Sequence, residues 1–130
     1  MKKEFAPYEL AVKLKDLGFN ESCFGFYLED GTWTPASYSR EGTVYPSNTD
    51  LLPEWCAAPL FQQAFRWFRE KHQLYCGILT EYSYGGQLHA YHITGKRQGD
   101  VSIGGFNTYE EAELACLTKL IEIMQGGDNE

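Results

Sequence analysis

The side chains best suited to acid–base or metal chemistry are His89 and His92, three positions apart in a segment expected to form a strand. Successive side chains of a strand point to opposite faces, so these two histidines cannot hold one metal ion without a bulge. A tight hairpin would place Glu81 diagonally across from His92, within reach of a long side chain. Glu81 and His92 therefore form a candidate polar pair for a proton or a metal ion, with a surface hydrogen bond as the simpler interpretation.

The cysteines are the other residues that could do chemistry, and they lie far apart in the chain at positions 23, 56, 76 and 116. Cys76 is close in sequence to His72, but it begins a predicted strand and should point into the core. A catalytic cysteine needs an exposed thiolate beside its histidine. The glycine pairs Gly85-Gly86 and Gly104-Gly105 are not followed by the lysine and the serine or threonine of a phosphate-binding loop. We therefore expect reduced structural cysteines, no catalytic residue, no cofactor and no metal.

Length and charge narrow the class of protein. The chain has 130 residues, and its 11 basic and 18 acidic residues give a formal net charge of −7. This acidic balance argues against general attraction to nucleic acid or to an anionic membrane. No apolar stretch follows Lys2 and Lys3 as it would in a signal peptide, and none is long enough to span a membrane. We expect a cytoplasmic protein with one domain over residues 1–125 and a frayed acidic tail over 126–130.

Three helices are expected from the spacing of apolar residues and from their end signals. The first covers residues 7–17 with a leucine stripe, the second covers residues 59–72, and the third follows a capping box formed by Thr108 and Glu111. Residues 40–58 contain many turn formers but also apolar side chains, which indicates a long loop held against the body.

Five strands are expected around two hairpins. Asp30-Gly31 joins residues 23–29 to residues 32–38, in a register that sets Leu28 opposite Trp33. A second turn at Gly85-Gly86 joins residues 75–82 to 88–94 and sets Ile78 opposite Ile93. We expect the sheet face that carries these two isoleucines to point inward. A short strand at 100–106 completes the order α-β-β-α-β-β-β-α. We predict an α+β fold with a four- or five-stranded antiparallel sheet and three helices packed mainly on one face.

Three parts of the chain resemble one family of small proteins. These parts are residues 8–27, the helical segment 57–72 that reads AAPLFQQAFRWFREKH, and residues 108–117 that read TYEEAELACL. The family consists of uncharacterised phage proteins carried by phages, prophages and mobile elements of gut anaerobic bacteria. The resemblance implies a mobile-element context, and it carries no catalytic residues with it.

The high aromatic content, 15% of the chain, points to possible surfaces of interaction. Most of it should be core, notably Phe24, Phe26, Phe61, Phe65 and Phe68. Tryptophan and tyrosine are enriched at the centres of protein interfaces, and several fall on the predicted edge strand, long loop and helix flank. The candidate interface comprises Trp33, Tyr38, Tyr45, Trp55 and Trp67. We expect a non-enzymatic protein-interaction module that binds a protein partner or itself, as in a homodimer.

The alternative is a weak binder of single-stranded nucleic acid. Such proteins stack bases on aromatic side chains beside a positive groove. The basic patch available for this is formed by Arg66, Arg69, Lys96 and Arg97.

Overall fold

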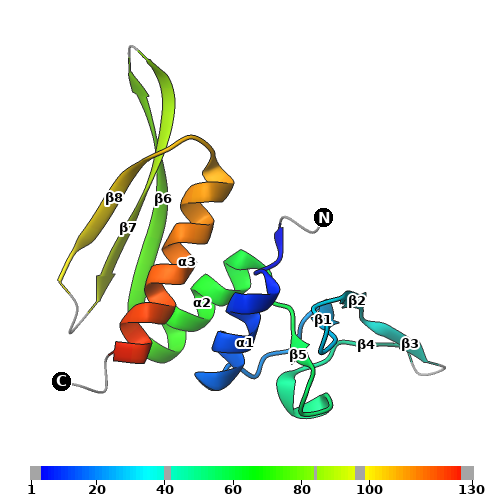
Figure 1. The fold of residues 1–130 in the computed structure, drawn as a ribbon. Helices are drawn as coiled ribbons and strands as arrows, with labels where there is room; N and C mark the ends of the chain where they lie inside the picture. Colours follow the sequence, from blue (N-terminus) through cyan, green and yellow to red (C-terminus); the bar gives the residue numbers. More distant parts are fainter. Residues whose placement is uncertain (1–3, 40–41, 84, 96–98, 127–130) are drawn as a thin grey trace. The chain divides into compact units, whose positions relative to one another are not determined.

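The structure is a computed structural model that describes residues 4–39, 42–83, 85–95 and 99–126. The side chains of residues 37–39 and 83 lie outside this description. Contacts gather in two compact units, unit 1 over residues 1–60 and unit 2 over residues 61–130 (Figure 1). The expected domain thus contains two units, and each is described by itself. The end of the expected tail, residues 127–130, lies outside the described residues.

Unit 1 begins with helix α1, Tyr8–Asp16, close to the predicted range. Its apolar stripe, Leu10, Ala11 and Leu14, is buried. Gly18 adopts φ 100°, a left-handed conformation that glycine accepts at little cost, and the helix ends before it.

The strands of unit 1 form two small antiparallel sheets. The first has the order β2-β1-β5 and consists of β1 (Gly25–Tyr27), β2 (Trp33–Pro35) and β5 (Cys56–Ala57). The second pairs β3 (Ser37–Ser39) with β4 (Gly42–Val44). The predicted loop 40–58 therefore contains two short strands and the 3-10 turn η2, Asn48–Asp50.

The register of the first hairpin differs from the prediction by one residue. Tyr27, not Leu28, lies opposite Trp33. The Leu28 and Gly31 amides bond to Thr32 and Leu28 oxygens, so the loop has three residues and ends on Gly31 at φ 87°. A three-residue loop closed by a left-handed glycine is a common hairpin alternative to the two-residue turn.

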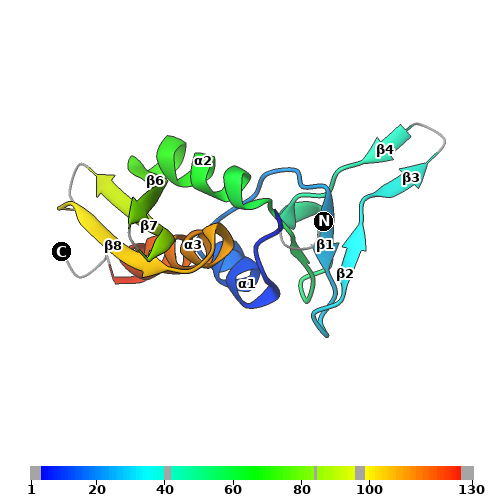
Figure 2. The ribbon, with the colours of Figure 1, turned by 90° about the horizontal axis from the view of Figure 1, so that it is seen from above.

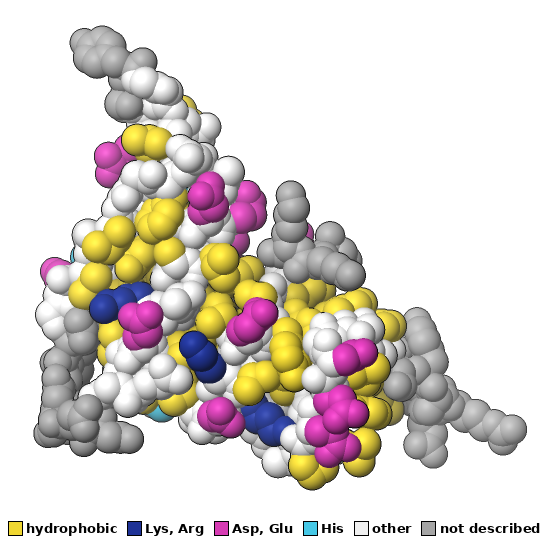
Figure 3. All heavy atoms as spheres, viewed as in Figure 1, with side chains coloured by type: hydrophobic (Ala, Val, Ile, Leu, Met, Phe, Trp, Pro, Cys, Tyr) yellow, Lys and Arg dark blue, Asp and Glu magenta, His cyan; other side chains and the backbone are white. Residues whose placement is uncertain are grey.

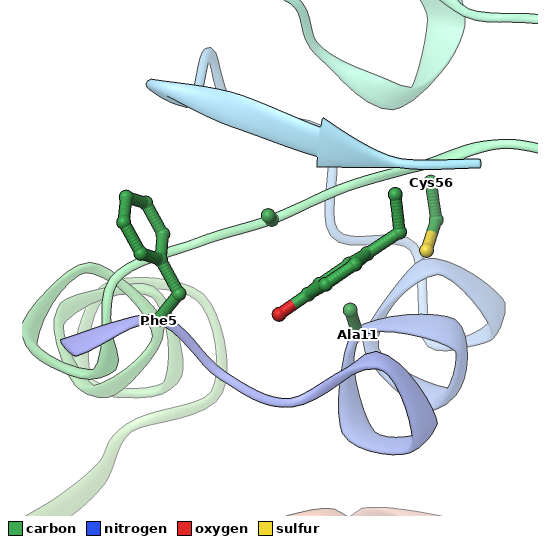
Figure 4. Close-up of a cluster of buried hydrophobic side chains, with 5 residues drawn as sticks. Phe5, Ala11 and Cys56 are labelled. Atoms are coloured by element: carbon green, nitrogen blue, oxygen red, sulfur yellow. The ribbon is translucent and has the colours of Figure 1, made fainter. Parts of the chain in front are cut away.

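The core of unit 1 gathers around Tyr27. Phe5, Ala11 and Cys56 come from separate segments and lie around this cluster (Figure 4), which Tyr27 and Ala58 complete. The Tyr27 hydroxyl donates a hydrogen bond of 2.6 Å to the Ala6 carbonyl oxygen. The tyrosine can therefore be buried without leaving its polar atom unpaired.

Unit 2 has the order helix, three strands, helix. Its elements are α2 (Phe61–His72), β6 (Leu74–Ser83), β7 (Gly86–Gly95), β8 (Val101–Phe106) and α3 (Tyr109–Gly126). The sheet has the order β6-β7-β8, and α2 and α3 lie on one side of it (Figures 1 and 2). The predicted cap of the last helix is confirmed, since the Glu111 amide donates a 3.0 Å hydrogen bond to the Thr108 hydroxyl oxygen.

The second hairpin turns one residue earlier than predicted. Ser83 pairs with Gly86, so Ile78 faces Tyr91 instead of Ile93. A shift of two in the pairing leaves every side chain on its predicted face. The inward face is confirmed, because His89, Tyr91 and Ile93 are all buried.

The α+β class with three helices is confirmed, but the single four- or five-stranded sheet is wrong. The described strands form two three-stranded sheets and one two-stranded sheet. Strands of the two hairpins do not pair with each other in the described part of the chain. In unit 1, β2 ends at Pro35, a residue that lacks the amide needed to extend a ladder.

Candidate functional site

The tryptophans of the candidate interface pack inward to different extents. Trp33 contacts Phe5 at a ring distance of 5.1 Å, and Trp55 stacks on Phe26 at 5.4 Å. Trp33 and Trp55 are both partly buried. Trp67 is only 4% exposed and packs against Phe68 and His72, so its expected place on an open helix flank is wrong. The Trp67 ring is large, so it can reach the core even from the edge of the apolar face of its helix.

Tyr45 is the candidate whose side chain is exposed, at 47%. The Tyr38 backbone lies in β3, and its side chain lies outside the described residues. Tyr45 meets Phe24 edge to face at 5.6 Å between ring centroids. Phe24, predicted to be core, is 54% exposed, because it precedes β1 instead of continuing its buried face. The neighbouring Val44 is also exposed. We call Phe24, Val44 and Tyr45 the Phe24–Tyr45 surface.

The backbone beneath this surface is fixed on both sides. The Cys23 amide donates to the Pro46 carbonyl oxygen at 2.9 Å, and the Ala36 amide donates to that of Phe24 at 2.8 Å. The first bond joins the segments that carry Phe24 and Tyr45, which lie 21 positions apart in sequence. The contact between the two rings therefore depends on tertiary structure, and no local sequence pattern predicts it.

The candidate polar pair is separated by the observed register. Glu81 lies opposite Leu88, whereas His92 lies opposite Gly77, which is four residues before Glu81 in β6. The His92 ring bonds instead through Nδ1 to the Ser102 hydroxyl at 2.7 Å. The simpler interpretation, a surface hydrogen bond, applies to His92, with a partner that the sequence did not identify.

His89 is buried against polar and aromatic neighbours. Its Nδ1 lies 2.9 Å from the Thr80 hydroxyl, and its ring meets Tyr109 edge to face at 6.1 Å. The register sets Thr80 opposite His89, and it sets Tyr82 opposite Gln87.

All four cysteines lie in the described residues and none of them forms a disulfide; three of them are buried. Burial raises the pKa of the Cys56 thiol to about 11. Hydrogen bonding between Cys76 and Cys116 lowers the pKa of Cys76 and raises that of Cys116. No group of three or more histidine, cysteine or acidic side chains in the described ranges is arranged to hold a metal ion.

The described surface includes a hollow in each unit. One, of about 290 Å³, lies in unit 1 and is lined by Tyr27, Gly31, Thr32 and Trp33. The other is a shallow groove of about 450 Å³ between α3 and the sheet of unit 2, with Tyr91, Phe106 and Leu114 in its lining. Hydrophobic side chains gather beside α3 along the sheet in Figure 3. Glu81 and His92 line neither hollow.

The basic patch is described only in part. Arg66 and Arg69 are exposed on α2, while Lys96 and Arg97 lie outside the described residues. The side of the sheet that faces away from the helices carries Tyr75 and His92 as its described rings. This is a sparse platform for stacking bases.

Sequence reasoning missed the exposed apolar residues of the unit 2 sheet, foremost Tyr75, Leu79 and Leu88. The alternation along each strand could have identified these residues, because the positions between inward-facing side chains must face outward.

None of the described helices combines the length and apolar character needed to cross a membrane. Comparison with known proteins finds no matching family, no similar curated protein and no similar solved structure.

Proposed function

We propose that this chain is a non-enzymatic protein-interaction module of mobile-element origin that contacts a protein partner through the Phe24–Tyr45 surface. The observation that carries this proposal is the pair of exposed rings in edge-to-face contact, 5.6 Å apart. Burying such rings against a partner removes a large apolar area from water, and aromatic residues dominate the energetics of protein interfaces.

The neighbouring β3–β4 hairpin supports the same proposal. Its two strands of three residues pair only with each other among the described strands. A two-stranded hairpin is marginally stable in water without further packing. Val44 ends β4 and belongs to the Phe24–Tyr45 surface, so a partner bound there would also pack against the hairpin.

Binding of single-stranded nucleic acid is the alternative and has less support. The net charge of −7 opposes it, and the described part of its basic patch is Arg66 and Arg69 on α2. Titration with a labelled single strand at low salt tests it directly, and salt-dependent binding would favour it over a protein partner.

A photo-cross-linking experiment tests the main proposal. A photoreactive phenylalanine analogue replaces Tyr45 in cells that carry the mobile element, and the same analogue at exposed Lys13 on α1 serves as the matched control. We expect one dominant protein adduct from position 45 that is lost in the Phe24→Ser variant. Phe24 is exposed, so this variant should keep its circular dichroism spectrum. No adduct at position 45, or the same adduct from position 13, would refute the proposal.

A further inference from the structure

Strand β6 forms one edge of the unit 2 sheet. All ten of its residues, Leu74–Ser83, pair with β7 without a break in register. No described strand pairs with its other side. A strand in this position presents a row of backbone amides and carbonyls that can pair with another chain.

The other edge of the same sheet is protected. Strand β8 has six residues, its register shifts between His89 and Tyr91, and Gly105 adopts φ 90°. Short length and a bulge are two ways in which proteins keep an edge from pairing.

Strand β6 lacks these protections. It has ten residues, no proline and no lysine, and Glu81 is its one charged side chain. Its exposed residues include Tyr75 at 47%, Leu79 at 55% and Tyr82 at 82%. A long, apolar, unprotected edge promotes aggregation unless another chain covers it.

We propose that β6 pairs antiparallel with β6 of a second copy of this chain, which joins the two sheets into one of six strands. A two-fold axis perpendicular to the sheet keeps the helices of both copies on one side. This interaction extends the proposed function to self-association, and it uses a different unit from the Phe24–Tyr45 surface.

The sequence of β6 is complementary to itself about Ile78. Pairing centred there aligns residues 74–82 of both copies and keeps each side chain on its own face. Tyr75 then lies opposite Glu81 of the second copy, and no like charges oppose each other. Leu79 lies opposite Gly77 of the second copy, which leaves room for it because no heavy atom lies within 4 Å of where a Gly77 Cβ would stand.

Charge placed at Leu79 tests the pairing. In this register the two Leu79 side chains are diagonal neighbours across the axis, within reach of long side chains. Leu79→Glu and Leu79→Lys should each weaken self-association about ten-fold or more, because each loses apolar burial and brings like charges together. An equimolar mixture of the two variants should restore association, since opposite charges then meet.

Sedimentation equilibrium across a concentration series provides the measurement. We expect wild type to reach twice its 14.8 kDa mass. Leu88→Lys is the matched control for Leu79→Lys, because Leu88 is exposed on the same sheet face but lies on the central strand β7, and a lysine there would stand opposite Glu81. Leu88→Lys and Phe24→Ser should both associate as wild type does, and the latter separates this proposal from that for unit 1. A monomeric wild type, or a dimer insensitive to charge at position 79, would overturn the proposal.

Discussion

Replacing Gly25 by alanine should destabilise unit 1. The Cβ of an alanine there would stand 2.6 Å from Cζ2 of Trp33 and 2.7 Å from the Thr34 carbonyl oxygen. Carbon atoms pack at about 3.5–4.0 Å, and the carbonyl belongs to the backbone of the paired strand β2, so relief requires the strands to separate. Overpacking of this kind costs about 1–3 kcal/mol. Alanine in place of glycine within a strand recovers about 0.5–1 kcal/mol of that cost. The middle of each range gives a net loss of about 1 kcal/mol in the free energy of unfolding.

Gly77→Ala is the matched comparison, because both glycines lie in strands and neither has a positive φ. A Cβ at Gly77 meets no heavy atom of its own chain within 4 Å, so alanine should stabilise the protein by about 0.5–1 kcal/mol when unfolding is measured at concentrations low enough to keep the chain monomeric. Urea unfolding followed by far-ultraviolet circular dichroism and tryptophan fluorescence measures both changes, and Trp33 and Trp55 report on unit 1. A Gly25→Ala protein as stable as wild type, or two alanine variants that shift in the same direction, would refute the steric argument.

Three further perturbations have defined outcomes. Thr108→Ala removes the cap that accepts the Glu111 amide and should cost about 1 kcal/mol, measured by thermal unfolding, whereas Thr108→Ser should cost little. Burial lowers the pKa of His72 below its ordinary 6.5, so the unfolded chain binds more protons, and stability should fall as the pH drops below about 6.5; a pH series of urea midpoints should lose this slope in His72→Phe. Burial raises the pKa of Tyr27 to about 12, so the contribution of Tyr27 to stability should be complete below pH 10 and be lost between pH 10 and 12, and Tyr27→Phe should make the fall in that window smaller.

The helices were the most predictable part of the fold. Apolar spacing and end signals are local, and Gly18 and the Thr108–Glu111 cap mark helix ends in the sequence as well as in the structure. The strands of unit 2 and the inward face of the second hairpin were predictable for the same reason, because alternation is a local pattern. The short strands β4 and β5 were not, since they lie in the predicted loop 40–58.

Registers were less predictable, because turn length depends on backbone geometry. Asp30-Gly31 indicates a hairpin, but Glu29 joins the turn and Gly31 supplies the left-handed residue. One added loop residue moves Tyr27 opposite Trp33. In the second hairpin the shift of two preserved the faces but separated Glu81 from His92.

The candidate site was predictable only as a list of residue types. Tyr45 and Phe24 meet through backbone bonds between distant segments, and Trp67 is buried by contacts that its helical position does not specify. The division of the strands among separate sheets has the same origin, since pairing between hairpins depends on tertiary structure.

The Asn48 side chain connects two other segments of unit 1 by hydrogen bonds. Its Nδ2 donates 2.7 Å to the Phe19 carbonyl oxygen, and its Oδ1 accepts 2.8 Å from the Ala57 amide. Chemical ageing can convert an asparagine to an aspartate by deamidation, which replaces the donor with a second acceptor. A carboxylate would then face the Phe19 carbonyl, so deamidation would break the bond to Phe19 while an oxygen that can accept from the Ala57 amide remains. For this chain, therefore, shelf life in storage depends on one amide group as well as on its core.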